Sequence, residues 1–370
     1  MEPAPGSSPA TLPAPRATPG APDRGLVVLL AVLLAALWPL AWAQSNGGLT
    51  SLLAVGVDGP SRALVTAEIP EAVLFGGLGH DGQQFYAVAR HPFDPAAARD
   101  ALDSPAYRYR RILFPAVSGA LAPGGGAPLI VAMLGVSLLG VALAAWALTR
   151  LADGPRWLPL VVGITPGVGI ALTLSLADAL ATGLAVAAIV ASTRRRWGWM
   201  TLALVAGALT RETLLLVAIG LACASGLSLQ RRLVTLGAPA AAVALWALWS
   251  TNALGTAAGE GAGQVSLPML GWLQSGDSRL GVLIGLGTTL VLGLGSWHLS
   301  RSSPDGRGIA VVLALHVMLM LCLADDVTSS WINTTRVAAP IFPVAVWALV
   351  RRAAPILPLS VPIAEPAGAP

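Results

Sequence analysis

The stretch RGLVVLLAVLLAALWPLAWAQ, residues 24–44, places twenty uncharged and mostly apolar residues after a single charge, Arg24. A helix needs about 17 to 25 apolar residues to cross the roughly 30 Å of bilayer hydrocarbon, so this stretch can span a membrane. Ala41-Trp42-Ala43 also has the small-x-small pattern of a signal-peptide cleavage site. We favour an uncleaved anchor, because the apolar run exceeds the usual signal-peptide core and further apolar segments follow.

The rest of the chain shares this apolar character. Of its 370 residues 55% are hydrophobic and only 11% are charged, and the mean hydropathy is +0.73. A soluble domain carries about 25% charged residues, so the composition indicates an integral membrane protein. The formal net charge is +4, but the basic residues are all arginine and lie between apolar runs, which is a topology signal rather than a nucleic-acid footprint.

Ten apolar segments have the spacing expected of transmembrane helices, which predicts an all-α polytopic membrane protein. They lie at residues 26–44, 127–149, 158–173, 177–193, 198–211, 213–229, 233–252, 280–299, 308–324 and 336–350. Pro166 is expected to bend the third segment. The membrane domain covers residues 24–352, and the Pro-, Ala- and Gly-rich ends at 1–23 and 353–370 are expected to be disordered cytoplasmic tails.

Arginines next to the segments predict the orientation, because basic residues near helix ends collect on the cytoplasmic side. If both termini are cytoplasmic, six turns or ends agree with this rule. Their arginines are Arg24, Arg150, Arg156, Arg194, Arg195, Arg196, Arg231, Arg232, Arg301, Arg307, Arg351 and Arg352. The long segment 45–111 then faces the periplasm or the cell exterior.

A second set of ionisable residues borders the outer ends of the segments. Charges inside a bilayer cost about 2.5 to 3.5 kcal/mol each, so such residues need a reason to be there. The set comes from five parts of the chain and consists of Asp81, Arg108, Arg110, Arg111, Asp178, Arg211, Glu212, Asp325, Asp326 and Arg336. These side chains are either interfacial anchors that reach water or parts of one site on the outer face.

Two stretches of the outer segment combine aromatic, amide and charged side chains. GHDGQQFYAVARHPF, residues 79–93, contains an isolated Asp81 in what is expected to be a flexible, glycine-flanked loop, with Gln83 and Tyr86 close behind. SPAYRYRRILFPAVSGAL, residues 104–121, contains Tyr109 among its arginines. Guanidinium groups suit phosphate, and aromatic faces suit sugar rings or lipid. An aromatic belt at the membrane interface would give the same pattern.

Two further charges sit at predicted helix starts. Asp178 opens a helix, where the helix dipole favours a carboxylate by about 0.3 to 1 kcal/mol. Thr210 is predicted to cap a helix that begins near Arg211. An arginine at a helix N-terminus opposes the dipole, which indicates an anionic partner for Arg211.

Together these residues resemble the GT-C class of integral-membrane glycosyltransferases, in particular bacterial relatives of the PIG-V-like mannosyltransferases and cell-surface glycopolymer formation proteins. The resemblance covers residues 26–230. It rests on Asp81 in the first outer segment, YRYRRILFP at 107–115, LADAL at 176–180 and LTRET at 209–213. Many members have paired acidic residues in the first outer loop, whereas here His80 precedes Asp81.

The resemblance implies a sugar donor on a polyprenyl phosphate, transfer on the outer face of the cell membrane, and Asp81 as the catalytic base. Arg211, and next Arg108, Arg110 and Arg111, are expected to bind the donor phosphate. Residues expected to bind or orient the substrate are Tyr86, Gln83, Tyr109, Asp178 and Glu212. No cofactor is predicted; a divalent cation could share the phosphate charge, but adjacent acids such as Asp325 and Asp326 are more typical of a solvated loop.

The expected partners are therefore a polyprenyl-phosphate sugar, membrane lipid and a glycan, lipid or protein acceptor, with no nucleic acid. Two alternatives remain at this stage. A lipid-sugar flippase or transporter would place polar residues near the membrane midplane, between broken helices. A noncatalytic subunit of envelope-polymer assembly would need no catalytic residue at all.

Overall fold

The computed structural model describes residues 23–151, 153–224, 227–255, 264–275, 279–302 and 306–351. The chain is mostly helical over these ranges, which confirms the predicted all-α class. The tails expected to be disordered, 1–23 and 353–370, lie outside the described residues except for Asp23.

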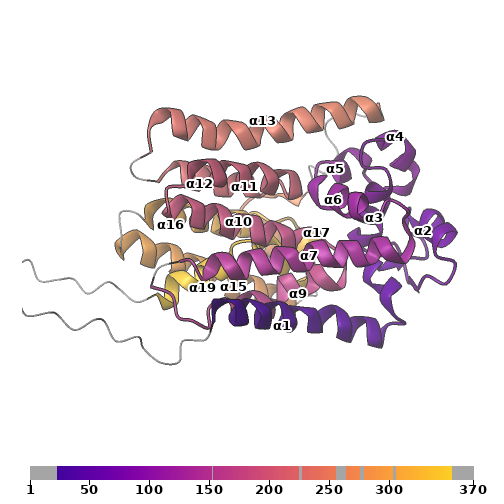
Figure 1. Cartoon of the computed structure of the whole chain (residues 1–370), viewed down its shortest axis with the longest axis horizontal. Helices are drawn as coiled ribbons and strands as arrows, with labels where there is room; N and C mark the ends of the chain where they lie inside the picture. Colours follow the sequence, from indigo (N-terminus) through magenta and orange to yellow (C-terminus); the bar gives the residue numbers. More distant parts are fainter. Residues whose placement is uncertain are drawn as a thin grey trace, which may run out of the picture.

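Several apolar helices run side by side (Figure 1). Four are long and apolar enough to cross a membrane, namely α1 (Arg24–Ser45), α7 (Gly126–Leu148), α13 (Leu229–Leu254) and α15 (Arg279–Ser302). The pair α18 (Trp331–Ala338) and α19 (Phe342–Val350), bent by 60°, would make a fifth span. Shorter apolar helices are α10 (Asp178–Thr193), α11 (Trp197–Thr210) and α16 (Arg307–Leu321). These helices are those of a membrane protein.

Prolines interrupt two of the expected segments. Residues 158–173 form α8 (Leu160–Ile164) and α9 (Pro166–Thr173), and Thr165 between them is extended. Proline has no N–H to donate and disfavours helix in the residue before it, so the break falls where Pro166 predicts it. The segment expected at 336–350 instead begins at Trp331 and breaks around Pro340. The helix within the segment expected at 213–229 is shorter than predicted, since α12 spans only Leu214–Ala222.

The outer segment is folded, which corrects the prediction of a flexible loop around Asp81. Its elements are η1 (Leu49–Leu53), β1 (Val55–Gly56), α2 (Arg62–Glu68), β2 (Leu74–Phe75), α3 (Asp81–Arg90), α4 (Pro95–Ala98), η2 (Arg99–Ala101) and α5 (Pro105–Tyr109), and α6 (Leu113–Leu121) follows it directly. β1 and β2 pair in parallel, with Val55 opposite Leu74. Fully buried Phe85 and Phe114 meet edge to face at 5.6 Å and anchor α3 to α6. Apolar burial of this kind offsets the entropy of ordering the segment.

The bundle has two chemically different ends. Helices α2 to α6 gather at one end, on the right of Figure 1, which we call the site end. At the other end Arg194 donates a hydrogen bond to the carbonyl of Arg150 (3.0 Å), and the guanidinium of Arg231 lies 5.4 Å from the ring centre of Trp197. We call this the arginine-rich end. Arg150, Arg194 and Arg231, three of the arginines predicted to lie on the cytoplasmic side, thus share one end of the bundle.

Glycines let α7 and α10 pack backbone to backbone. A Cβ on Gly140 would clash with the main chain at Ala179 and Leu180, and a Cβ on Gly183 would lie 2.5 Å from the carbonyl oxygen of Gly140. Small residues at such crossings drive helix association in lipid, where the hydrophobic effect between helices is absent. This contact fixes α10, which begins with Asp178, against α7.

Replacing Gly140 should therefore destabilise the bundle. We expect Gly140→Val to lower the free energy of unfolding by about 1 to 3 kcal/mol, because the side chain has no room and must push α10 away. Equilibrium unfolding in mixed micelles measures this change. Gly135→Val on the same helix is the control, since a Cβ there has no neighbour within 4 Å and the expected change stays near 0.5 kcal/mol or less. Equal losses in both variants would contradict close α7–α10 packing.

Candidate functional site

A polar cavity of about 530 Å³ lies at the site end. Three carboxylates and five arginines line it, namely Asp81, Glu212, Asp326, Arg108, Arg110, Arg111, Arg211 and Arg336. Uncharged polar groups come from Tyr107, Thr213, Gln264 and Asn333. Part of the wall is apolar and consists of Val265, Leu319, Leu323, Val327 and Val337. The cavity therefore joins a charged surface to a hydrocarbon-like one.

Asp81 is held by two arginines from distant parts of the chain. Its Oδ1 lies 2.8 Å from Nη1 of Arg108, and its Oδ2 accepts a hydrogen bond from Nη2 of Arg336 at 3.0 Å. Asp81 is the first residue of α3, and Gly82 behind it touches the carbonyl of Leu174, where a Cβ would clash. The start of α3 is thus pressed against the segment that leads into α10.

Asp178 forms the buried floor of this ion network. Its side chain is 1% exposed and contacts the guanidinium of Arg211, while its Oδ2 lies 3.2 Å from Nε of Arg336. Arg336 on α18 therefore bridges two carboxylates, Asp81 and Asp178. Buried charges persist only when they are paired, so the three arginines and two carboxylates depend on one another.

A second network of paired groups also lines the cavity. Glu212 lies 2.8 Å from Nη2 and 3.0 Å from Nε of Arg111, which is a two-point contact between carboxylate and guanidinium. Arg111 also donates to the hydroxyl of Tyr107, and its charge sits 4.6 Å from the centre of that ring. The amide of Gln264 donates to the same hydroxyl at 2.8 Å. Rigid pairs of this kind hold guanidinium groups ready to face a ligand.

The arginines determine the ionisation of the carboxylates at the site end. Burial alone would raise the pKa of Asp81, but the charges of Arg108, Arg336 and Arg111 outweigh burial and hold the pKa well below its usual range. Burial would also raise the pKa of Glu212, but the charge and the hydrogen bond of its partner Arg111 outweigh burial and lower that pKa to about 2. Burial lowers the pKa of His80; Asp81 partly opposes this change, and Arg336 adds to it.

Eight residues of the outer-boundary set meet around the cavity, and a ninth, Asp178, pairs with two of them from beneath. Asp325 is not among the lining residues. One local prediction was wrong: Thr210 ends α11 instead of capping a new helix, and its hydroxyl donates to the carbonyl of Ala206. Arg211 therefore follows a helix C-terminus, where the dipole favours a cation. Its carboxylate partner is Asp178.

Three residues expected to touch substrate do not line the cavity. The hydroxyl of Tyr86 contacts Glu68 and accepts the N–H of Gly126 at 2.6 Å. The Nε2 of Gln83 donates to the carbonyl of Leu78 at 2.7 Å. The hydroxyl of Tyr109 donates to the carbonyl of His91. All three side chains are buried and hold the outer segment together, because a polar group that leaves water needs a protein partner.

Several lining residues were not assigned a role from sequence. Arg336 belonged to the outer-boundary set, and its position within WINTTRVA, a polar interruption at 331–338 before an apolar run, was the available signal. Tyr107 belongs to the stretch YRYRRILFP at 107–115, whose alternating aromatic and basic pattern does not distinguish it from Tyr109. Gln264 lies in a connection far from the outer segment in sequence, and nothing in its local pattern points to Tyr107.

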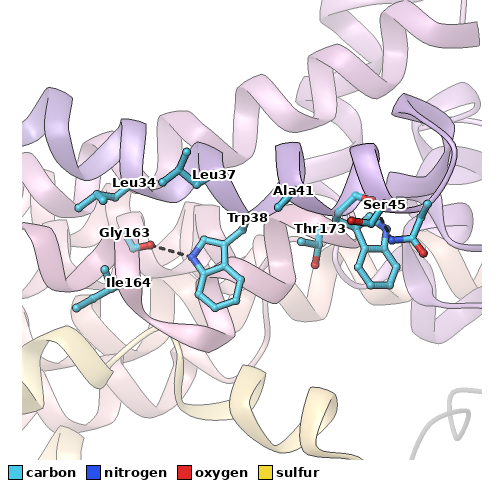
Figure 2. Close-up of a pocket in the computed structure, with 10 residues that line it drawn as sticks. Leu34, Leu37, Trp38, Ala41, Ser45, Gly163, Ile164 and Thr173 are labelled. Atoms are coloured by element: carbon cyan, nitrogen blue, oxygen red, sulfur yellow. Dashed lines mark hydrogen bonds between the residues drawn. The ribbon is translucent and has the colours of Figure 1, made fainter.

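Two further observations concern possible metal-binding groups and a second cavity. Among the described residues, no group of three or more His, Cys, Asp and Glu side chains is placed to hold a metal ion. A second cavity of about 670 Å³ lies between α1 and α8–α9, where Trp38 donates to the carbonyl of Gly163 at 3.1 Å (Figure 2). Its lining side chains carry no charge, so it offers room for hydrocarbon and no acid or base.

No protein-family model matches the chain, and neither the curated proteins nor the solved structures give a significant match. The functional conclusion therefore rests on the residues of the cavity.

Removing the bridging arginine should unfold the site end. We expect Arg336→Gln to lower the free energy of unfolding by about 3 to 5 kcal/mol, because two carboxylates lose a partner and one of them is fully buried. Arg62→Gln is the control, since Arg62 is an exposed arginine at the same end that donates to the carbonyl of Val57, and the expected change is below about 0.5 kcal/mol. Unfolding in mixed micelles compares the two. Equal stability of Arg336→Gln and wild type would show that the bridge does not stabilise the fold.

The pH dependence of stability should report the pairing of Asp81. Its folded pKa lies below the unfolded value of about 3.9, so the ionised carboxylate stabilises the fold above that pH, and the contribution is lost as the pH falls through the folded pKa. The difference in free energy of unfolding between wild type and Asp81→Asn should hold steady above about pH 5 and shrink below about pH 4. Asp100→Asn, an exposed carboxylate at the site end, should show little difference at any pH. A gap for Asp81→Asn that widens on acidification would refute the pairing.

Proposed function

We propose that this chain is a GT-C-like membrane glycosyltransferase. In this proposal it transfers a sugar from a polyprenyl phosphate to an envelope glycan, lipid or protein on the extracytoplasmic face of the cell membrane. The observation that carries the proposal is Asp81, a carboxylate in a cavity that five arginines and an apolar wall complete. That combination fits a reaction with one base, one anionic leaving group and one lipid chain.

The arginines support binding of a lipid phosphate. Arg211 is 7% exposed, lines the cavity, and its buried Nε has no acceptor within the described part of the chain. A buried donor without a protein partner is a place for a ligand oxygen. Arg108, Arg110 and Arg111 line the same cavity and can share the phosphate charge. The apolar side chains Leu319, Leu323 and Val337 would then face the first units of the prenyl chain.

The chemistry is a single displacement at the anomeric carbon. The acceptor oxygen forms a bond to that carbon, the bond from the carbon to the phosphate oxygen breaks, and the hydroxyl proton passes to the carboxylate of Asp81. One carboxylate suffices for such an inverting transfer, because the leaving phosphate is stabilised by charge rather than by protonation. Glu212 and Asp178 orient Arg111 and Arg211 and so act as positioning residues.

The pairing of Asp81 with arginines fits a reaction in which the donor binds before the acceptor. A carboxylate bound by Arg108 and Arg336 is a weak base, since both guanidinium groups stabilise its ionised form. A donor phosphate that takes over hydrogen bonds from these arginines would raise the basicity of Asp81 when the acceptor arrives. Donor binding would thereby prepare the base.

The proposal places the site end outside the cytoplasm, with both termini inside and about ten crossings of the chain. Its support is the grouping of Arg150, Arg194 and Arg231 at the opposite end. In this proposal the four long helices each cross the membrane, and the interrupted and short helices make the remaining crossings.

Purified protein in lipid, supplied with a panel of radiolabelled polyprenyl-phosphate sugars and membrane-derived acceptors, tests the proposal. We expect Asp81→Asn to slow transfer by about 10² to 10⁴-fold, because it removes the base. Arg211→Ala should slow transfer by about 10² to 10³-fold, because it removes stabilisation of the leaving phosphate. Asp100→Asn, an exposed carboxylate that lies outside the cavity lining, is the control and should retain wild-type transfer.

Transfer at wild-type rates by folded Asp81→Asn would remove the catalytic role of this residue. No transfer from any donor, together with normal envelope polymer in cells that carry the point variants and loss of polymer on deletion, would favour a noncatalytic assembly subunit.

A lipid-sugar flippase or transporter is the second candidate. The interrupted pairs α8–α9 and α18–α19 favour it, because α9 and α18 pack together at Gly167 and Thr335, and broken helices surround the sites of many transporters. Movement of a fluorescent lipid-linked sugar across protein-containing vesicles, abolished in Arg336→Gln protein that is shown to remain folded and without sugar transfer, would establish this function instead.

A further inference from the structure

A third cavity, of about 670 Å³, lies at the arginine-rich end, remote from the polar cavity. Its floor is α10, and α7 and α11 form its two walls. The floor presents Leu184, Ala187, Val190 and Ala191, which are apolar and partly small. Small floor residues leave a groove between the neighbouring helices.

Three arginines stand at one end of this groove. Arg150 comes from the end of α7, Arg194 from the end of α10, and Arg196 from the start of α11. None of the three has a carboxylate partner among the described residues, whereas the charges of Asp81 and Asp178 at the site end are paired. The buried Nε of Arg150 also has no acceptor within the described ranges. This cluster carries unbalanced positive charge beside an apolar channel.

Two exposed tryptophans lie beside these arginines. Trp146 is 47% exposed and Trp199 is 66% exposed, and both line the groove. The guanidinium of Arg150 lies 4.8 Å from the centre of the Trp146 ring. Tryptophan prefers the headgroup level of a bilayer, and arginine next to it can reach phosphate.

The groove has the length of one membrane leaflet. From Leu184 to Arg194 the floor helix advances about 15 Å, at roughly 1.5 Å per residue. That is about half of the roughly 30 Å hydrocarbon thickness. An acyl chain that enters at the arginines would therefore end near the bilayer midplane.

We propose that this groove binds one anionic phospholipid, with the phosphate at Arg150, Arg194 and Arg196 and one acyl chain along α10. The site is separate from the proposed glycosyl transfer and does not depend on it. Arginine pockets between transmembrane helices fit anionic headgroups, because both charge and hydrocarbon are matched. A zwitterionic lipid offers the same chains but an added cation that the three arginines repel.

Native mass spectrometry of the detergent-purified full chain, titrated with phosphatidylglycerol or with phosphatidylcholine, tests this site. We expect one tightly bound phosphatidylglycerol and markedly weaker binding of phosphatidylcholine. The triple variant Arg150→Ala/Arg194→Ala/Arg196→Ala should bind phosphatidylglycerol at least about tenfold more weakly, since each arginine near an anionic headgroup contributes roughly a factor of five. Arg301→Ala, an arginine at the same end that lies 4.5 Å from the ring centre of Trp297 and outside the groove, is the control and should bind like wild type.

Ala187→Trp tests the groove separately from its charge. The indole side chain would fill the groove above α10 while all three arginines remain, so we expect this variant to lose the bound phosphatidylglycerol. Equal affinity of the wild type and the triple variant would overturn the proposal, and so would equal binding of the two lipids. Retained binding by Ala187→Trp would also overturn it, because the lipid would then sit on surface arginines. If the triple variant does not fold, the comparison of Ala187→Trp with wild type decides.

Discussion

The ion network around Arg336 is the interaction on which the site end depends. One guanidinium joins Asp81 at the start of α3 to Asp178 at the start of α10, and Arg211 contacts Asp178 from the other side. Charges at a membrane boundary that lose water are costly unless each has a partner. Four segments that are far apart in sequence must therefore meet in one arrangement, and the cavity results from that arrangement.

Interrupted helices make this meeting possible. Arg336 lies on α18, a short helix that ends before the break around Pro340. Because α18 is not continuous with α19, the side chain of Arg336 can reach both α10 and α3. Glycines supply the complementary close approach, with Gly82 against Leu174 and Gly167 against Thr335. A continuous helix with larger residues at these points would separate the carboxylates from their arginines.

The two ends of the bundle use arginine for different purposes. In the polar cavity the guanidinium groups of Arg108, Arg111, Arg211 and Arg336 are bound to carboxylates, which fixes their positions, and the charges of Arg108, Arg336 and Arg111 lower the pKa of Asp81. At the arginine-rich end Arg150 and Arg194 contact aromatic or backbone groups and keep their charge unbalanced. The first pattern suits recognition of a reacting phosphate, and the second suits the anionic surface of a lipid leaflet. The two ends therefore differ in whether carboxylates balance the charge of the arginines, and not in the number of arginines.

The sequence by itself determined the membrane class, the helical fold, the approximate positions of the long helices and the break at Pro166, because hydrophobic length and proline geometry are local properties. It also gathered the charged residues of the cavity into one set, since charges beside apolar runs are expected at a membrane boundary. Only the tertiary structure decided which of these charges pair, because partners such as Arg336 and Asp81 are 255 residues apart. It also decided that Tyr86, Gln83 and Tyr109 serve the packing of the outer segment. A tyrosine or an amide has the same local pattern whether it binds a ligand or a buried backbone carbonyl, and only the folded surroundings distinguish the two.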